Sequence, residues 1–132
     1  MCSLQGGLAF QKGLGAVHSL SHPLGGLTHK RLHHGTLNAI FLPFVMEFNF
    51  DHCKEKMQMM ADRLKIKDAY TLPNQFTLLN QQLGLPQKLR ELGISKDELE
   101  PLAQRAKEDH CTPTNPRPLS VDDCIRLYTE AW

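Results

Sequence analysis

The sequence predicts an all-α domain built as a helical bundle. Apolar residues recur at spacings of three and four along several segments, which is the pattern of helices that face a core. No stretch alternates apolar and polar residues as a strand does, and no repeat with a period of about 20–50 residues is present. A chain of 132 residues with 41% hydrophobic residues is typical of one globular domain. We expect one helical domain over residues 1–132, with a helix pair over 4–48 and further helices over 51–132.

The first expected helical segment, Leu4 to Leu24, is interrupted by glycines at positions 6, 7, 13 and 15. Each glycine inside a helix costs about 0.5–1 kcal/mol relative to alanine. An isolated helix with four of them would be unstable. We therefore expect this segment to pack tightly, with another backbone or a ligand lying close to the glycines.

A second helix is expected from Thr36 to Phe48, followed by another that begins near Asp51. The apolar stripe of the second helix consists of Leu37, Ile40, Phe41, Phe44, Val45 and Phe48. The stripes after it consist of Met57, Met60, Ala61 and Leu64, and of Phe76, Leu79 and Leu83. Gly84 and Gly93 follow the last apolar residues of two short segments, as glycines at helix ends do.

Capping signals mark the last two helices. Ser95 followed by Glu98 is a capping box, and Ser120 with Asp123 is expected to start the final helix. The apolar faces behind these caps are Leu99, Leu102, Ala103 and Ala106, and Val121, Ile125, Tyr128 and Trp132. Between the two helices, Thr112 to Leu119 contains three prolines and is expected to be an ordered connector.

Charge and cysteine content exclude several classes of protein. Fifteen Lys and Arg residues against fourteen Asp and Glu give a net charge of +1, so no excess positive field would hold a nucleic acid or an anionic membrane. The longest apolar run has eight residues, far fewer than the roughly 20 that span a bilayer. The N-terminus has no secretory pattern, so a cytoplasmic location is expected. The cysteines, Cys2, Cys53, Cys111 and Cys124, form no CxxC pair and are expected to be reduced thiols.

Histidines are concentrated near the N-terminus, where five of the seven fall between His18 and His34. His18 and His22 lie four residues apart and would project from one face of a helix, and a short loop returns the chain to His33 and His34. Neutral imidazole is a common ligand of zinc and iron. The alternative is that these rings cap helix ends or are solvated, which is the expectation for His29.

Several known site motifs are absent. Residues 1–46 contain no Asp or Glu, so any carboxylate ligand must come from elsewhere, and the HExxH pattern of metalloproteases is missing. Gly13-Leu14-Gly15 does not extend to the GxGxxG of a dinucleotide-binding turn, because His18 stands where the third glycine should be. No GxSxG elbow surrounds the serines near His22.

The run from Gly13 to Asn49 nevertheless resembles the signature of the iron-containing (group III) alcohol dehydrogenases. The features that carry the resemblance are His18, His22-Pro23-Leu24-Gly25, His34-Gly35, Asn38-Ala39 and Leu42-Pro43. LRELGI (residues 89–94) and TNPRPLS (residues 114–120) are also similar to the C-terminal part of that family. The resemblance implies the helical C-terminal domain of the dehydroquinate synthase-like and iron-containing alcohol dehydrogenase fold, truncated at its N-terminal side.

The resemblance also assigns roles to the histidines. It implies that His18 and His34 are metal ligands for Fe²⁺, with Zn²⁺ as the other option, and that His33 is the alternative to His34. It implies that His22 lies near the nicotinamide and the substrate as a catalytic and cofactor-binding residue. NAD(P) would be bound mainly by a domain outside these residues. An Asp and another His, also outside these residues, would complete the metal site.

The expected function is therefore part of an iron-dependent, NAD(P)-linked alcohol dehydrogenase that interconverts alcohols and aldehydes. Iron would act as a Lewis acid while hydride moves from the alcohol carbon to NAD(P)⁺. The chain alone is expected to be inactive, and to form a homo-oligomer or to pair with an N-terminal nucleotide-binding part. The alternatives are an inactive helical interaction module, and a metal-free or zinc-bound reductase of the same superfamily.

Overall fold

The computed structural model describes residues 1–132, apart from the side chain of Cys2. Its α-helices are α1 (Cys2–Phe10), α2 (Ala16–Gly25), α3 (His34–Asn49), α4 (Lys54–Arg63), α5 (Leu72–Gln82), α6 (Leu99–Glu108) and α7 (Val121–Ala131). Short 3-10 turns lie at Phe50–His52, Ala69–Thr71, Leu89–Leu92, Lys96–Glu98 and Thr112–Thr114. No strand occurs in the part of the chain that the structure describes, so the all-α prediction is confirmed.

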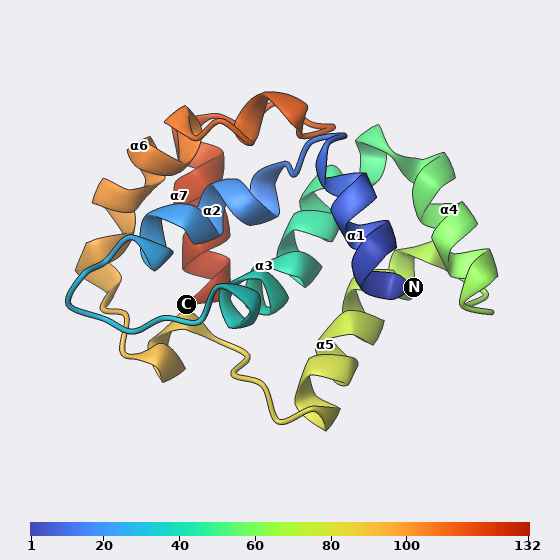
Figure 1. Cartoon of the computed structure of the whole chain (residues 1–132), viewed down its shortest axis with the longest axis horizontal. Helices are drawn as coiled ribbons and strands as arrows, with labels where there is room; N and C mark the ends of the chain where they lie inside the picture. The colour runs from blue at the N-terminus through green and yellow to red at the C-terminus, as the bar shows by residue number, and fades with distance from the viewer.

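Two apolar cores hold α2 to α7 together, and α3, which runs through the middle of the molecule in Figure 1, contributes to both. The larger core lies among α2, α3, α6 and α7, and the smaller one joins the end of α3 to α4 and α5. Leu20, Leu37 and Phe41 are fully buried in the larger core. Burial of each such side chain contributes about 1.5–3 kcal/mol. The buried hydroxyl of Tyr128 on α7 donates a hydrogen bond of 2.7 Å to the Leu20 carbonyl on α2, so its polar atom is satisfied.

The first expected helix is two helices, because the chain turns at Gly13 and Gly15. Both glycines have positive φ, +99° and +74°, which side chains rarely adopt. The expected close packing is found there, since a Cβ on Gly15 would lie 3.0 Å from Asn115 Oδ1 and one on Gly13 would clash with Thr114. The expectation of close packing is wrong for Gly6 and Gly7. These glycines lie on the exposed helix α1, and a Cβ added at either would have no atom within 4 Å.

Three predicted apolar faces also need correction. On α7 the buried residues are Cys124, Leu127, Tyr128 and Ala131, whereas Val121, Ile125 and Trp132 are only partly buried. The reason is that α7 packs against both α6 and α3, so its buried stripe is centred one position away from the predicted one. In the smaller core Met57 and Ala61 are buried, but Met60, Leu64, Leu79 and Leu83 are exposed on α4 and α5.

Local predictions at helix starts are confirmed. Both capping boxes form, Ser95 with Glu98 and Ser120 with Asp123. Cys53, Cys111 and Cys124 are free thiols, while the expectation for Cys2 lies outside the described side chains. Among the described residues, no helix has the length and apolar character needed to cross a membrane.

Asn115 in the proline-rich connector fixes the start of α2. Its Oδ1 accepts hydrogen bonds from the Ala16 backbone N–H at 3.0 Å and from Asn49 Nδ2 at 2.9 Å. Its Nδ2 donates to Asn49 Oδ1 at 2.7 Å and to the Arg117 carbonyl. One buried amide therefore joins α2, the end of α3 and the connector.

Replacement of Asn115 by Ala should destabilise the fold. The substitution leaves the Ala16 N–H and the Asn49 amide buried without their partner, and each unsatisfied group costs about 1–3 kcal/mol. Chemical denaturation measures the decrease in the free energy of unfolding. Asn74→Ala, an exposed asparagine on α5, is the matched control and should change stability by less than about 0.5 kcal/mol. Equal effects of the two substitutions would refute the role given to Asn115.

The Ser95–Glu98 cap predicts a pH dependence of stability. Hydrogen bonds from the Ser95 backbone N–H and hydroxyl, which outweigh the effect of burial, lower the pKa of Glu98 from 4.5 to about 2. Because the folded pKa is the lower one, ionised Glu98 stabilises the fold above pH 4.5, and this contribution is lost as the pH falls toward about 2. Glu98→Ala should cost about 1 kcal/mol at pH 7. The difference from the parent chain should narrow between pH 4.5 and 2 in urea titrations; a difference that stays constant over that range would contradict this account.

Candidate metal centre

Three imidazole rings meet where α2 passes the start of α3. The ring centroids of His18 and His22 are 5.6 Å apart, those of His18 and His34 are 5.2 Å apart, and those of His22 and His34 are 5.5 Å apart. His18 and His22 lie one turn apart on α2, and His34 is the first residue of α3. The three histidines named from the sequence are therefore brought together.

Asn38 lies between two of these rings, one turn into α3. Its Nδ2 is 3.3 Å from His18 Nε2 and 3.0 Å from His34 Nε2, so both ring nitrogens face one point. Two buried atoms of this group, His18 Nδ1 and Asn38 Oδ1, have no hydrogen-bond partner among the described residues. Buried polar atoms are nearly always satisfied in folded proteins. The group therefore fits a ligand or a further protein segment, and two convergent imidazole nitrogens fit a transition metal.

The charge state of His18 suits a metal ligand. Burial, followed by the neighbouring His34 and His22 rings, lowers the pKa of His18 below its usual value, although Asp109 acts in the opposite direction. The neutral ring, which has a free nitrogen lone pair, is therefore favoured.

The structure separates the positions of the two adjacent histidines, which spacing alone left open. His33 is the N-cap of α3, and its Nδ1 accepts a hydrogen bond from the Thr36 backbone N–H at 3.3 Å. His34, not His33, faces His18 and Asn38. His29 is largely exposed and interacts with Glu98, as expected for a solvated loop residue.

A carboxylate reaches the histidines from the end of α6, 87 positions along the chain. Asp109 Oδ2 is 3.0 Å from His22 Nδ1. Burial works against ionisation of Asp109, but hydrogen bonds from the Cys111 backbone N–H and from His22 outweigh it, and the pKa of Asp109 is lowered. Ionised Asp109 therefore orients the His22 ring.

His110 and Cys111 belong to the same turn as Asp109. The His110 ring stacks on His22 with centroids 5.5 Å apart, and Cys111 is buried. One ligand atom from each of these residues lies within 4.8 Å of the others in a group that we call the α2–turn cluster: His22, Asp109, His110 and Cys111. Sequence reasoning missed the three turn residues. The available signal was the run of three consecutive residue types that bind metals, Asp-His-Cys.

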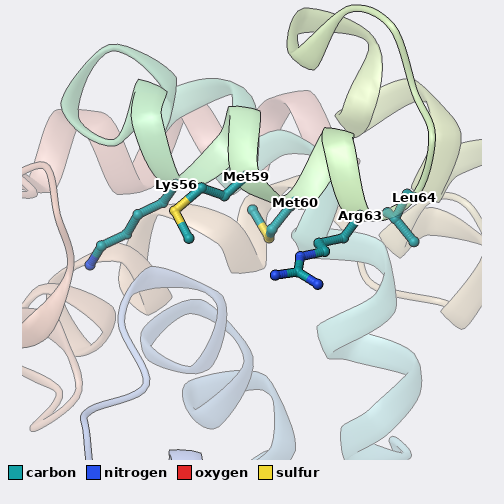
Figure 2. A pocket seen from close by; sticks show the side chains of 5 residues that line it. All are labelled: Lys56, Met59, Met60, Arg63 and Leu64. Carbon is teal, nitrogen blue, oxygen red and sulfur yellow. The ribbon is translucent and has the colours of Figure 1, made fainter.

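A separate surface groove lies on α4. It has a volume of about 710 Å³ and is lined by Lys56, Met59, Met60, Arg63 and Leu64. Figure 2 shows these five side chains pointing to one side of α4. None of them is a carboxylate, an imidazole or a thiol, so this groove offers apolar contact rather than reaction chemistry.

Known proteins resemble this chain over nearly its full length. A model of the Fe-containing alcohol dehydrogenase family, C-terminal, matches residues 1–132. The 4-hydroxybutyrate dehydrogenase of Cupriavidus necator is 39% identical over 136 residues, which are 98% of this chain and 36% of that protein. The lactaldehyde reductase of Escherichia coli K12 is 36% identical over 135 residues, which are 96% of this chain and 35% of that protein.

A solved structure has the same fold. The iron-containing alcohol dehydrogenase from Thermococcus thioreducens superposes with a TM-score of 0.78 and 31% sequence identity. The match covers 89% of this chain and 32% of that chain, so these residues span about a third of the length of the relatives they match. This chain therefore belongs to the iron-containing alcohol dehydrogenase family and corresponds to its C-terminal helical part.

Proposed function

We propose that the chain is the C-terminal part of an iron-dependent, NAD(P)-linked alcohol dehydrogenase, and that it supplies His18 and His34 as metal ligands and His22 as the ring beside the nicotinamide and substrate. The observation that carries the proposal is the convergence of the three rings, with centroids 5.2–5.6 Å apart. The two buried atoms without partners, His18 Nδ1 and Asn38 Oδ1, support a ligand at this point. A divalent iron bound there would supply Lewis acidity toward an alcohol oxygen.

The residues of this chain would position the reactants and handle a proton. Asp109 accepts the Nδ1 hydrogen of His22, and this leaves His22 Nε2 free to accept a proton from a reacting hydroxyl. Asn38 Nδ2 lies at the point that His18 Nε2 and His34 Nε2 both face. Its side-chain amide would turn aside when an ion takes the lone pairs of these two nitrogens, because an N–H donor and a metal cannot share one lone pair.

The remaining parts of the proposed enzyme must come from outside these residues. The two relatives are named for 4-hydroxybutyrate and for lactaldehyde, and each is about three times as long as the segment it shares with this chain. We therefore assign NAD(P) binding, the further metal ligands and the choice of alcohol to the rest of such a protein. Zinc could replace iron, because imidazoles do not by themselves select between the two metals. A cytoplasmic location stays a prediction.

A second candidate function is that of a helical interaction module without activity of its own. The specific observation is the exposed apolar surface: Leu4, Leu8 and Phe10 on α1 are 64%, 55% and 60% exposed. On α4, Met59 is 65% exposed beside the groove of Figure 2. Apolar patches of this kind mark interaction surfaces in soluble proteins.

A chimera tests the proposed dehydrogenase. The C-terminal third of the E. coli lactaldehyde reductase would be replaced by this chain, and bound iron and nicotinamide-linked reduction of lactaldehyde would be measured. His18→Ala and His34→Ala should lose both iron and activity, since each removes a ligand. His22→Ala should keep the iron but lower turnover by at least about a hundredfold, the lower end of the effect of a general acid–base group.

The control for the chimera is His29→Ala, a largely exposed ring that should leave iron content and turnover unchanged. Loss of iron in His22→Ala to the same extent as in His18→Ala would refute this division of roles. A folded chimera that binds no iron would refute the proposal as a whole.

The interaction module makes its own prediction for the isolated chain. Analytical ultracentrifugation should show concentration-dependent self-association. Met59→Lys combined with Leu64→Lys should weaken it more than tenfold, because two apolar side chains of about 1.5–3 kcal/mol each would no longer be buried. Gln58→Lys adds a charge to α4 outside the groove and is the matched control. A chain that stays monomeric while binding one iron tightly would exclude this candidate.

A further inference from the structure

The α2–turn cluster combines His22 and Asp109 with two metal-binding side chains, His110 and Cys111, that have no part in the proposed dehydrogenase. Three of its four residues are consecutive, at positions 109–111, and the fourth is His22 on α2. Helices α2 and α6 pack against each other, and the turn after α6 therefore lies beside His22. The cluster is thus held by the larger core of the fold.

Short contacts join its members. His22 Nδ1 lies 3.0 Å from Asp109 Oδ2, and His110 Nδ1 lies 3.7 Å from Asp109 Oδ1. Cys111 Sγ lies 3.4 Å from His110 Nε2. In a tetrahedral zinc site with ligand bonds of about 2.0–2.3 Å, neighbouring ligand atoms are roughly 3.3–3.8 Å apart. One ligand atom from each of the four residues already lies within 4.8 Å of the others, so these atoms would draw together by about 1 Å to reach that geometry.

The turn itself is pre-formed. Asp109 ends α6 in an extended conformation, and its Oδ1 accepts a hydrogen bond of 2.8 Å from the Cys111 backbone N–H. The Thr112 backbone N–H donates to the Asp109 carbonyl at 3.0 Å. These bonds fold the three turn residues toward α2, so an ion would meet ordered ligands rather than a mobile loop.

The donor set selects the class of metal. Two imidazoles, one carboxylate and one thiol form a mixed nitrogen, oxygen and sulfur set, which suits Zn²⁺ and related transition metals. Magnesium and calcium prefer oxygen ligands and are disfavoured here. We propose that the α2–turn cluster is a zinc site, separate from the point between His18 and His34.

The two sites are distinct because different atoms converge at each. His18 and His34 direct their Nε2 atoms toward Asn38, whereas His22 Nδ1 is directed toward Asp109. The α2–turn cluster takes all four ligands from this chain, so it needs no other part of a longer protein. Since the proposed function gives the same His22 a role beside the nicotinamide, an ion in the cluster would remove that ring from the reaction.

Zinc binding would release the thiol proton of Cys111 to solvent as the sulfur becomes a thiolate ligand. Burial, together with the neighbouring Asp109, raises the pKa of Cys111 to about 11, so the free thiol is protonated at neutral pH. A divalent ion supplies the positive charge that offsets both effects.

Cobalt(II) is the probe for this site, because it occupies zinc sites and shows a thiolate-to-cobalt charge-transfer absorption when sulfur is bound. One equivalent added to the metal-free, reduced chain should produce this absorption, and one equivalent of Zn²⁺ should remove it, since zinc binds such sites more tightly. Cys111→Ser should abolish the absorption. Cys53→Ser, which changes a partly buried thiol elsewhere, is the matched control and should retain it.

His110→Ala is a second test variant that should fold normally, because the His110 ring is 80% exposed and its removal leaves the core intact. It should weaken cobalt binding at least tenfold, since even residues behind the ligands change metal affinity by about 10–100-fold. His18→Ala and His34→Ala should keep the charge-transfer absorption, so failure here is separable from failure of the proposed iron site. Absence of the absorption in the parent chain, its persistence in Cys111→Ser, or unchanged affinity in His110→Ala would overturn the proposal.

Discussion

The docking of the connector after α6 onto the first turn of α2 is the constraint on which the histidine cluster depends. Asn115 holds the Ala16 N–H, and Gly15 lies so close to Asn115 that a side chain at that position would displace it. This contact sets the rotation and register of α2 and therefore the direction of His18 and His22. The packing of α2 on α3 then brings His34 to them. A substitution at Asn115 in the connector would therefore alter the orientation of the His18 and His22 rings, although these lie more than 90 residues before it in the sequence.

Much of this arrangement follows from local pattern. Two helix ends joined by a short loop bring the histidines together without any long-range assumption, and the capping boxes at Ser95 and Ser120 depend only on residues three positions apart. Spacing left the choice between His33 and His34 open. The N-cap geometry settled which ring faces His18, because a ring that caps the helix cannot also point across it. The ligand roles themselves came from the family resemblance and remain proposals.

The features that sequence reasoning missed are long-range. Asp109 approaches His22 only because α6 packs on α2, and no periodicity encodes that contact. The buried face of α7 was displaced for a related reason: the apolar residues of this helix form a broad stripe, and the neighbouring helices decide which of them are covered. Sequence reasoning also could not foresee which apolar residues of α1 and α4 are exposed. The chain corresponds to about a third of its relatives' length, and its periodicity does not show which apolar faces are covered within that third.

Charge distinguishes the two places where histidines gather. Residues 1–46 contain no carboxylate, so His18 and His34 offer a divalent ion only neutral donors from this chain. The α2–turn cluster contains Asp109 and the thiol of Cys111, and these together can balance both positive charges of the ion. In a partly buried site an uncompensated charge is costly. The isolated chain should therefore hold a divalent ion at the cluster in preference to the histidine pair, and the pair should bind tightly only when another part of the protein adds a carboxylate.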